Sequence, residues 1–459
     1  MRTLRSITAF LILAPALLPA QEDTQGPSDG LGPFRSRLWV SVQGNFIRQQ
    51  HSAFPARYSG TNSFLPDREH ATSRVETLYT GFRITKRLEI LADVESAGGA
   101  GLSTALGIAG FTNVDVVRNP TLGEEPYLAR LMLHYTIPLS KRTVAATRNA
   151  FSLSTAVPAR RLELRLGKMS AVDFFDVNSV GSDSHLQFMN WSIVNNGAYD
   201  YAANTRGYTY GFLAEYYAGR WAARFSEMLM PTVANGQELD WNIFRARGEN
   251  FEVEYRASTL RDRAGSVRAL AFVNHALMGS YRQAIDGYLS GKDSIPDVTL
   301  YRRQGRVKYG FGLNAEQELT PLWRVFGRLG WNEGANESFA YTEIDRTAAI
   351  GCDFRGKPWR RSSDKIGAAF VTNAISGDHR RYLALGGLGF ILGDGALRYA
   401  REQIFEAYYT AHIWRGISFA VDYQHVTNPG YNEDRGPASV VGFRVHVEDA
   451  VPFDKRSGN

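Results

Sequence analysis

Amphipathic alternation with a period of two residues recurs along the chain and is the feature that most constrains its fold. Between Phe251 and Tyr255, apolar side chains occupy the odd positions and glutamates the even ones. The pattern recurs in residues 127–139, with Tyr127 on the apolar face, and in residues 307–317. A strand with this period has one apolar and one polar face. The pattern predicts an all-β protein. Membrane proteins and water-soluble sandwiches share it, so other features must decide between these two classes.

The N-terminal segment has the plan of a secretory signal peptide. Arg2 and Arg5 precede an apolar stretch over residues 7–18, and the small residue Ala20 precedes a polar run. The alternative is a single membrane helix, but the stretch is shorter than the roughly 20 residues that such a helix needs. We therefore predict export and cleavage after Ala20. If the mature chain lies in a membrane it must form a closed barrel, because only helices and barrels satisfy every backbone group in lipid.

Composition is consistent with a large exported barrel. The 52 Lys and Arg residues against 46 Asp and Glu give a net charge of +6, which is too small to predict nucleic-acid binding. A single cysteine, Cys352, excludes an internal disulfide, and we interpret it as a structural residue in a loop rather than a nucleophile. Aromatic residues make up 12% of the chain and there are 44 glycines, which suits interfacial aromatic girdles and twisted strands.

The period-two template predicts a transmembrane antiparallel β-barrel of about 16 strands. Short turns such as residues 85–87 and 320–321 alternate with long polar or Gly-rich loops, which is typical of periplasmic turns and extracellular loops in outer-membrane barrels. The candidate strands are residues 37–46, 73–84, 88–95, 126–138, 161–169, 207–217, 220–229, 249–257, 266–275, 305–317, 322–333, 364–375, 381–391, 403–413, 417–426 and 438–448. The predicted organisation is a signal peptide (1–20), a periplasmic segment (21–36), the barrel (37–448) and a polar tail (449–459).

A barrel of about 16 strands leaves an aqueous channel, so its polar face should line water. The alternative for each wall residue is a solvated side chain with no role in selectivity. The candidate channel-lining residues on the wall are Arg130, Arg165, Glu254, Arg256, Arg324 and Arg328.

The third long loop, residues 170–206, is the candidate filter. It retains Phe174, Phe175, Phe188 and Trp191, and these side chains need a packed surface that folding into the barrel would supply. Its polar groups would then meet sugar hydroxyls, and its aromatic faces would stack on pyranose C–H surfaces. The alternative is an extracellular lid packed for stability. The candidate substrate-contacting residues of this loop are Asp173, Asp176, Asp183, His185, Trp191, Asn195, Asn196 and Asp200.

Catalytic motifs are absent from the sequence. The nine histidines show no metal-ligand spacing, no GxSxG elbow occurs, and the Gly-rich residues 98–110 and 386–395 match no phosphate-binding fingerprint. The run Asp183-Ser184-His185 places three catalytic residue types side by side, but adjacency in sequence is not triad geometry. We therefore predict no catalytic residues, no metal and no cofactor.

Several short motifs resemble the carbohydrate-selective porins of the OprB type. They are residues 402–409 (EQIFEAYY), residues 422–426 with the following 428–430, and residues 436–444 (GPASVVGFR), which resemble the last part of these porins. Residues 164–176 are similar to the strand and loop start that precede the family's constriction. The resemblance implies a 16-stranded outer-membrane channel for passive diffusion of small carbohydrates, in contact with outer-membrane lipid and lipopolysaccharide and assembled by the barrel-assembly machinery. It leaves a monomer and a homotrimer open, and it assigns no individual sugar contact.

Two other functions stay open at this point. The arginine-rich wall suits a channel or exporter for anions or anionic polysaccharide, and the alternation alone also suits a secreted all-β enzyme or binding protein. A TonB-dependent receptor is excluded because residues 21–36 are too few to form a plug domain.

Overall fold

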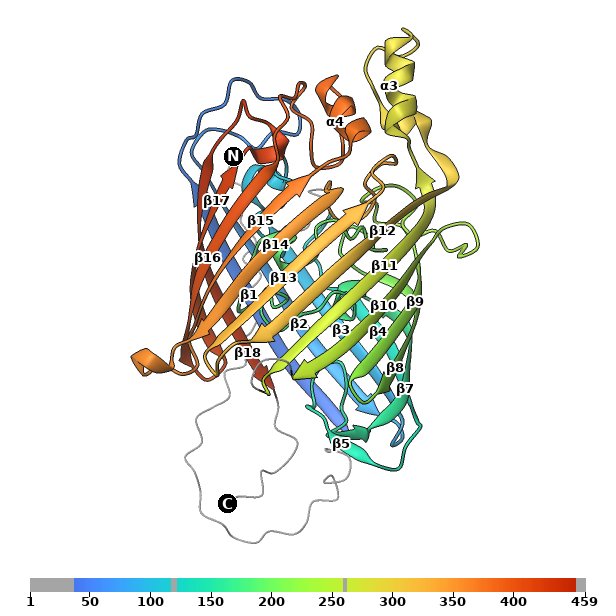
Figure 1. Cartoon of the computed structure of the whole chain (residues 1–459), viewed down its shortest axis with the longest axis vertical. Helices are drawn as coiled ribbons and strands as arrows, with labels where there is room; N and C mark the ends of the chain where they lie inside the picture. Colours follow the sequence, from blue (N-terminus) through green and yellow to red (C-terminus); the bar gives the residue numbers. More distant parts are fainter. Residues whose placement is uncertain (1–36, 117–121, 259–261, 451–459) are drawn as a thin grey trace, which may run out of the picture.

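Sixteen strands close into one antiparallel barrel (Figure 1). The computed structural model describes residues 37–116, 122–258 and 262–450, so the predicted signal peptide, the segment 21–36 and nearly all of the predicted tail lie outside the described residues. The barrel strands are β1 (Leu38–His51), β2 (Glu69–Arg83), β3 (Leu88–Gly99), β4 (Tyr127–Pro138), β7 (Arg160–Met169), β8 (Thr209–Ala218), β9 (Trp221–Leu229), β10 (Arg247–Ser258), β11 (Ala264–Met278), β12 (Arg303–Glu318), β13 (Trp323–Asn332), β14 (Arg346–Arg355), β15 (Lys365–Ala374), β16 (Glu402–Trp414), β17 (Ile417–Thr427) and β18 (Ala438–Ala450).

The first and last strands pair and so remove every sheet edge. β1 and β18 run antiparallel, from Ser41 opposite Ala450 to His51 opposite Val440. All other neighbours follow one another in the chain, except that the small hairpin of β5 (Thr143–Ala145) and β6 (Ala156–Pro158) lies between β4 and β7. Closure satisfies the backbone groups of every strand within the sheet, which is the condition for crossing lipid. The predicted closed barrel of sixteen strands is confirmed.

Two predicted strand assignments are wrong. Residues 346–355, assigned to no strand, form β14, and Cys352 therefore lies on the wall rather than in a loop. Residues 381–391 are not a strand, because α4 (Gly377–Ala384) occupies their start. The Ser376 side chain accepts a hydrogen bond from the His379 backbone N–H and so caps this helix.

A β-bulge reverses the alternation near the start of β4. Asp93 of β3 lies opposite Arg130, but the next residue, Val94, lies opposite Leu128, so one residue of β4 is unpaired. An extra residue turns the side chains beyond it to the other face. Tyr127, predicted on the apolar face, consequently faces the barrel interior, and Leu128 faces outward.

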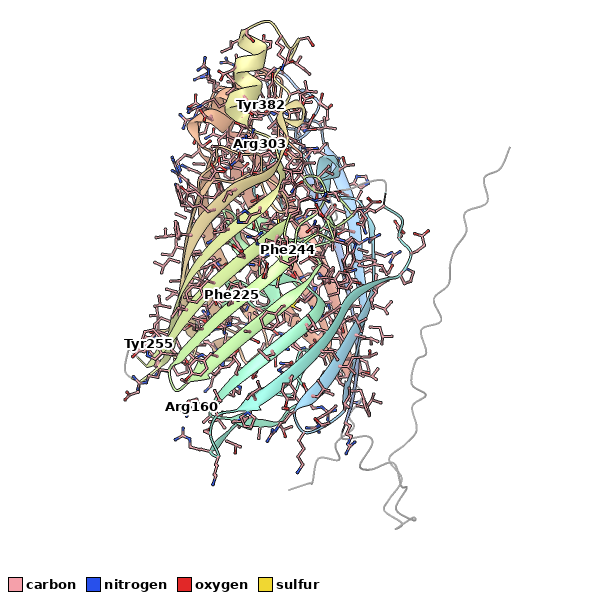
Figure 2. All side chains as sticks on the ribbon, turned by 90° about the vertical axis from the view of Figure 1, so that its right-hand side faces the viewer. Arg160, Phe225, Phe244, Tyr255, Arg303 and Tyr382 are labelled. Atoms are coloured by element: carbon pink, nitrogen blue, oxygen red, sulfur yellow. The ribbon has the colours of Figure 1, made fainter. Side chains whose placement is uncertain are left out.

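The outer wall is an apolar band. Phe225, Phe251 and Leu329 are among its exposed side chains, whereas the inward-facing positions of the same strands are largely polar. Figure 2 shows Phe225 partway up the wall, with Arg160 near one end of the barrel and Arg303 near the other. Charged side chains beyond both ends of an apolar band are expected of a wall that faces lipid.

No helix among the described residues has both the length and the apolarity needed to cross a membrane.

The two ends of the barrel differ in their connections. One end, which we call the short-turn end, carries turns such as residues 84–87 and 415–416, and the other, the long-loop end, carries α3 and α4 (Figure 1). The helices are α2 (Trp191–Val194), α3 (Tyr281–Leu289) and α4, with the 3-10 turns η1 (Leu102–Thr104), η2 (Ala171–Asp173), η3 (Val298–Tyr301), η4 (Lys357–Trp359) and η5 (Pro429–Tyr431).

Candidate channel and its constriction

Residues 170–206, which we call the inserted loop, fold into the barrel. Phe188 is fully buried and packs edge-on against Tyr408 of β16, with 4.9 Å between ring centroids, and lies 6.0 Å from Phe326 of β13. Phe175 and Tyr199 are also buried. Aromatic side chains on a loop of this length are stable only against a packed surface, and the inner wall provides it. The inward fold places this loop across the lumen.

Charged groups on the wall fix the inserted loop. The Arg328 guanidinium of β13 lies 2.7 Å from an Asp176 carboxylate oxygen and donates to the Ser182 hydroxyl at 2.7 Å. On β18, Arg444 donates to the backbone oxygens of Ser184 and Gln187 at 2.7 and 2.8 Å. Buried charges need such partners. Both arginines therefore stabilise the inserted loop in its docked position through these contacts.

A second loop forms a layer beside the inserted loop. The backbone N–H of Trp191 donates to the Phe111 oxygen at 2.9 Å, and the backbone N–H of Val114 donates to the Met189 oxygen at 2.9 Å. The Gln49 side chain of β1 donates to the Thr112 oxygen at 2.8 Å. Residues 102–116 therefore join the inserted loop to β1, and the two loops together fill much of the barrel.

A cavity of about 870 Å³ remains along β1 to β4. Its lining includes Trp39 and Asp449 at the short-turn end, Tyr79 and Arg130 on the wall between, and Asn235 toward the long-loop end. The lining thus reaches both ends of the barrel. Its volume lies in the range of about 300–1,000 Å³ that is typical of small-molecule sites.

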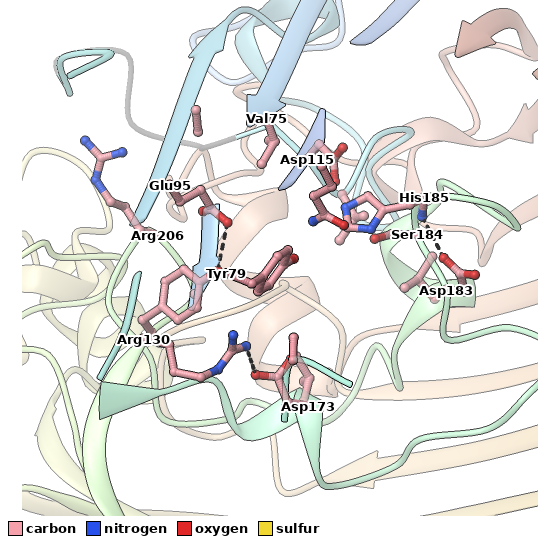
Figure 3. A pocket seen from close by; sticks show the side chains of 18 of the residues that line it. Val75, Tyr79, Glu95, Asp115, Arg130, Asp173, Asp183, Ser184, His185 and Arg206 are labelled. Atoms are coloured by element: carbon pink, nitrogen blue, oxygen red, sulfur yellow. Dashed lines mark hydrogen bonds and ion pairs between the residues drawn. The ribbon is translucent and has the colours of Figure 1, made fainter. Parts of the chain in front are cut away.

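Charged groups face one another across this cavity (Figure 3). Arg130 forms an ion pair with Asp173 of the inserted loop and another with Asp93 of β3. Figure 3 shows Arg130 and Arg206 on one side of the opening and Asp115 on the other. Glu95 lies on the same side as Arg206, and the pairing of Arg130 with two carboxylates leaves little net charge on that side.

Aromatic rings line the same cavity. Tyr79, Tyr127 and Tyr208 are half-buried. The Tyr208 hydroxyl donates to the Glu95 carboxylate at 3.0 Å, and the Tyr127 hydroxyl donates to the same carboxylate. Trp191 differs, because only 7% of its surface is exposed. One face of its ring stacks on Tyr341, with 5.3 Å between centroids. The tyrosines therefore offer more aromatic surface to a solute than Trp191 does.

The structure separates the predicted site residues into three groups. Those that line the main cavity are Asp173, Asp183, His185, Trp191, Asn195 and Arg130. Those that line a separate cavity of about 580 Å³ at the short-turn end are Glu254, Arg256 and Arg324. Those that are buried in contacts outside both linings are Asp176, Asn196, Asp200, Arg165 and Arg328.

The buried group holds the loops in place. The Asp200 carboxylate lies 3.1 Å from the Lys308 ammonium and accepts from the backbone N–H groups of Phe339 and Ala340. Arg165 donates to Glu215 at 2.9 Å. These side chains position the constriction without facing its water.

Sequence reasoning missed several residues of the main cavity. Tyr79 and Glu95 follow the period-two alternation of β2 and β3, so that signal was available for both. Alternation placed Tyr127 on the wrong face, because the bulge near the start of β4 reverses the pattern. Asp115 and Arg206 lie in loops, where alternation carries no information.

No cluster of three or more metal-ligating side chains occurs within residues 37–116, 122–258 and 262–450.

A buried histidine joins the loops at the long-loop end. His379 of α4 lies 3.4 Å from Glu343 and 3.2 Å from Asp345, and its ring stacks on Tyr281 of α3 at 4.2 Å. Burial alone would lower the pKa of His379, but hydrogen bonds and charge attraction from the two carboxylates raise it to about 9. The imidazolium therefore joins α3, α4 and residues 343–345 at neutral pH.

The fold and the cavity together define a water-filled outer-membrane channel: a closed barrel with an apolar band outside, a polar lumen, and loops that narrow it. Comparison with known proteins adds the family. The model of the carbohydrate-selective porin, OprB family, matches residues 72–448. The chain belongs to this family.

A solved structure shows the same fold. The high pH structure of Pseudomonas putida OprB superposes with a TM-score of 0.66 at 12% sequence identity and covers 91% of this chain and 95% of that chain. The outer-membrane channel DcaP of Acinetobacter baumannii gives a TM-score of 0.49 at 10% identity and covers 90% and 96% of the two chains. None of the curated protein sequences compared with the chain matches it.

The protein is thus an outer-membrane β-barrel, and the resemblance of its motifs to OprB-type porins is confirmed. In such barrels the short turns face the periplasm and the long loops face the exterior. The short-turn end is accordingly the periplasmic end.

Proposed function

We propose that the protein is a passive porin through which small neutral sugars diffuse along the main cavity. The observation that carries this proposal is the joint presence, along one path between the two ends, of half-buried tyrosines and hydrogen-bonding charged groups. A sugar presents hydroxyls at its edge and C–H groups on its faces. Carboxylates such as Glu95 and Asp115 accept from hydroxyls, and the rings of Tyr79 and Tyr127 cover C–H faces.

The excess of acidic residues along the main cavity favours a neutral solute over an anion. Apart from Arg130 and Arg206, the charged lining of the main cavity is acidic, with Glu95, Asp115 and Asp173 in its middle. The remaining acidic lining residues are Asp183, Glu448 and Asp449. An anion channel needs excess positive charge along its path, and this path has excess negative charge. The predicted arginine-rich wall thus gives no support to an anion or polysaccharide channel, because Arg165 and Arg328 are buried in pairs away from it.

Sugar binding should interrupt the ion current through single channels. Purified protein in planar bilayers is expected to conduct K⁺ somewhat better than Cl⁻, and added glucose or maltose should reduce the current in a saturable manner. Tyr79→Leu should weaken the block by sugar several-fold and leave the sugar-free conductance nearly unchanged, since the ring carries no charge.

Tyr309→Leu is the matched control, because Tyr309 lies on the outer wall with 44% of its surface exposed. A folded channel that is anion-selective, or one that no sugar blocks, would contradict the proposal.

A further inference from the structure

The connection between β4 and β7, residues 139–159, is the longest connection between the described strands at the periplasmic end. The hairpin of β5 and β6 forms its base below the barrel (Figure 1). Its tip turns back into the lumen, and we therefore call it the re-entrant turn. Leu153 near this tip is fully buried and lies beside Leu91 and the backbone of Gly81 on the inner wall.

Polar contacts hold the tip inside the barrel. The Glu89 carboxylate of β3 accepts from the Leu153 backbone N–H at 3.1 Å and from the Ser154 hydroxyl at 3.2 Å. Arg165 of β7 donates to the Phe151 oxygen at 3.0 Å. Three contacts to two buried wall charges fix the backbone of the tip, so its position is built into the fold.

A tight turn at the tip presents Phe151 to the main cavity. The backbone N–H groups of Phe151 and Ser152 donate to the Asn149 side-chain oxygen at 2.8 and 3.0 Å, and Asn149 and Ser152 pair through their backbones. Asn149, Ala150 and Phe151 all line the cavity, and Phe151 is half-buried. The re-entrant turn therefore narrows the channel from the periplasmic side.

Phe151 also contacts the part of the constriction that the inserted loop forms from the extracellular side. The Arg130 guanidinium lies 4.5 Å from the centroid of its ring, and the same arginine pairs with Asp173 of the inserted loop. Phe151 and Phe174 of that loop form a T-shaped ring contact, with 6.2 Å between centroids. The narrow part of the channel is thus assembled from an extracellular loop and a periplasmic turn that meet inside the barrel.

We propose that the re-entrant turn forms the inner half of the sugar site, with Phe151 as an aromatic platform for the C–H face of a pyranose and the Asp173 carboxylate, held in place by Arg130, as an acceptor of hydrogen bonds from its hydroxyls. This inference rests on the proposed function. A solute that leaves toward the periplasm passes Phe151 after Tyr127 and Tyr208. The re-entrant turn then contributes to solute selectivity and also narrows the channel.

Current fluctuations caused by sugar separate binding from width. With glucose or maltose in planar bilayers, Phe151→Leu is expected to raise the sugar dissociation rate about threefold to tenfold, which is the scale of a lost aromatic contact. The sugar-free conductance should change little, because leucine keeps apolar volume against Phe174. Phe151→Trp should keep the slow sugar dissociation of the wild-type channel, because tryptophan also offers an aromatic face. Phe225→Leu, on the outer wall, is the matched control.

A shortened turn provides a second test. Replacing residues 143–157 by a short Gly-Ser linker should raise conductance and speed sugar dissociation together, and heat-modifiable migration on a denaturing gel shows whether the barrel has formed. If the shortened barrel does not form, the Phe151 substitutions still decide the question in the full-length chain.

The outcomes distinguish this inference from the proposed function. A wild-type channel that sugar does not block at all contradicts the proposed function itself. A wild-type channel that is blocked, with the same dissociation rate in Phe151→Leu and Phe151→Trp, overturns only the assignment of Phe151. A rise in conductance in proportion to the faster dissociation in Phe151→Leu also overturns it, because the turn would then set width alone.

Discussion

Replacing Arg328 by leucine should release the inserted loop from the wall. Arg328 is buried, with 1% of its surface exposed, and its guanidinium contacts Asp176, Ser182 and the Ile193 oxygen. Removing one partner of a buried ion pair costs about 3–5 kcal/mol, because the other charge stays buried without compensation. Since about 1.4 kcal/mol is a factor of ten, the docked loop should lose roughly 10²-fold or more of its preference over undocked states.

The barrel itself should survive this change, because β13 keeps its backbone pairing with β12 and β14. We expect higher and noisier single-channel conductance, and cleavage within residues 170–206 by added protease. The double variant Arg328→Leu with Asp176→Asn is the control, since it also removes the uncompensated carboxylate and should recover part of the wild-type behaviour. Wild-type conductance and protease resistance in Arg328→Leu would refute the assignment of Arg328 as an attachment of the inserted loop.

Three further predictions concern the wall and the outer loops. Val253→Arg places a charge on the lipid-facing side of β10 and should destabilise the barrel by about 2–4 kcal/mol in urea unfolding from micelles or vesicles; an unchanged midpoint would mean that the face is wrong. Glu254→Gln should retain the barrel but shift ion preference toward anions, because Arg224, Arg256 and Arg268 then lose a shared carboxylate partner; an unchanged reversal potential would contradict this. The pKa of His379 is raised from 6.5 to about 9, so its ion pairs stabilise the loops fully below about pH 6.5 and lose that stabilisation as pH rises through about 9. The protection of the amides of α3 and α4 from hydrogen exchange, relative to the intrinsic rate at each pH, should fall across that range, and His379→Gln should show low protection already at pH 7.

Side-chain contrast determined which strands the sequence could predict. In β10, phenylalanine and valine alternate with glutamate, and the alternation located the strand and its faces. In β14, Ala348 and Cys352 on one face alternate with Ala349 and Gly351 on the other, so Ile350 alone gives contrast in the middle of the strand, and the polar residues Thr347 and Asp353 mark the inner face only near its ends. Its identity as a strand comes from pairing with β13 and β15, which no local pattern contains.

The constriction could be predicted in place but not in detail. Aromatic residues in a long loop required a packed surface, and that requirement gave the inward fold of residues 170–206. Asp173 and Asp176 are the same residue type three positions apart, yet one lines the cavity and the other is buried against Arg328. Which carboxylate meets water depends on distant partners. The bulge that turns Tyr127 inward depends in the same way on the register with β3.

Channel recording with a trimmed inserted loop tests the central claim most directly. The claim is that residues 170–206 narrow a path for sugars along β1 to β4. Deleting the middle of this loop while keeping β7 and β8 should raise single-channel conductance and weaken discrimination among sugars, because the narrow part and its hydrogen-bonding groups are lost together. A correctly folded, trimmed channel with unchanged conductance and unchanged sugar block would contradict the account.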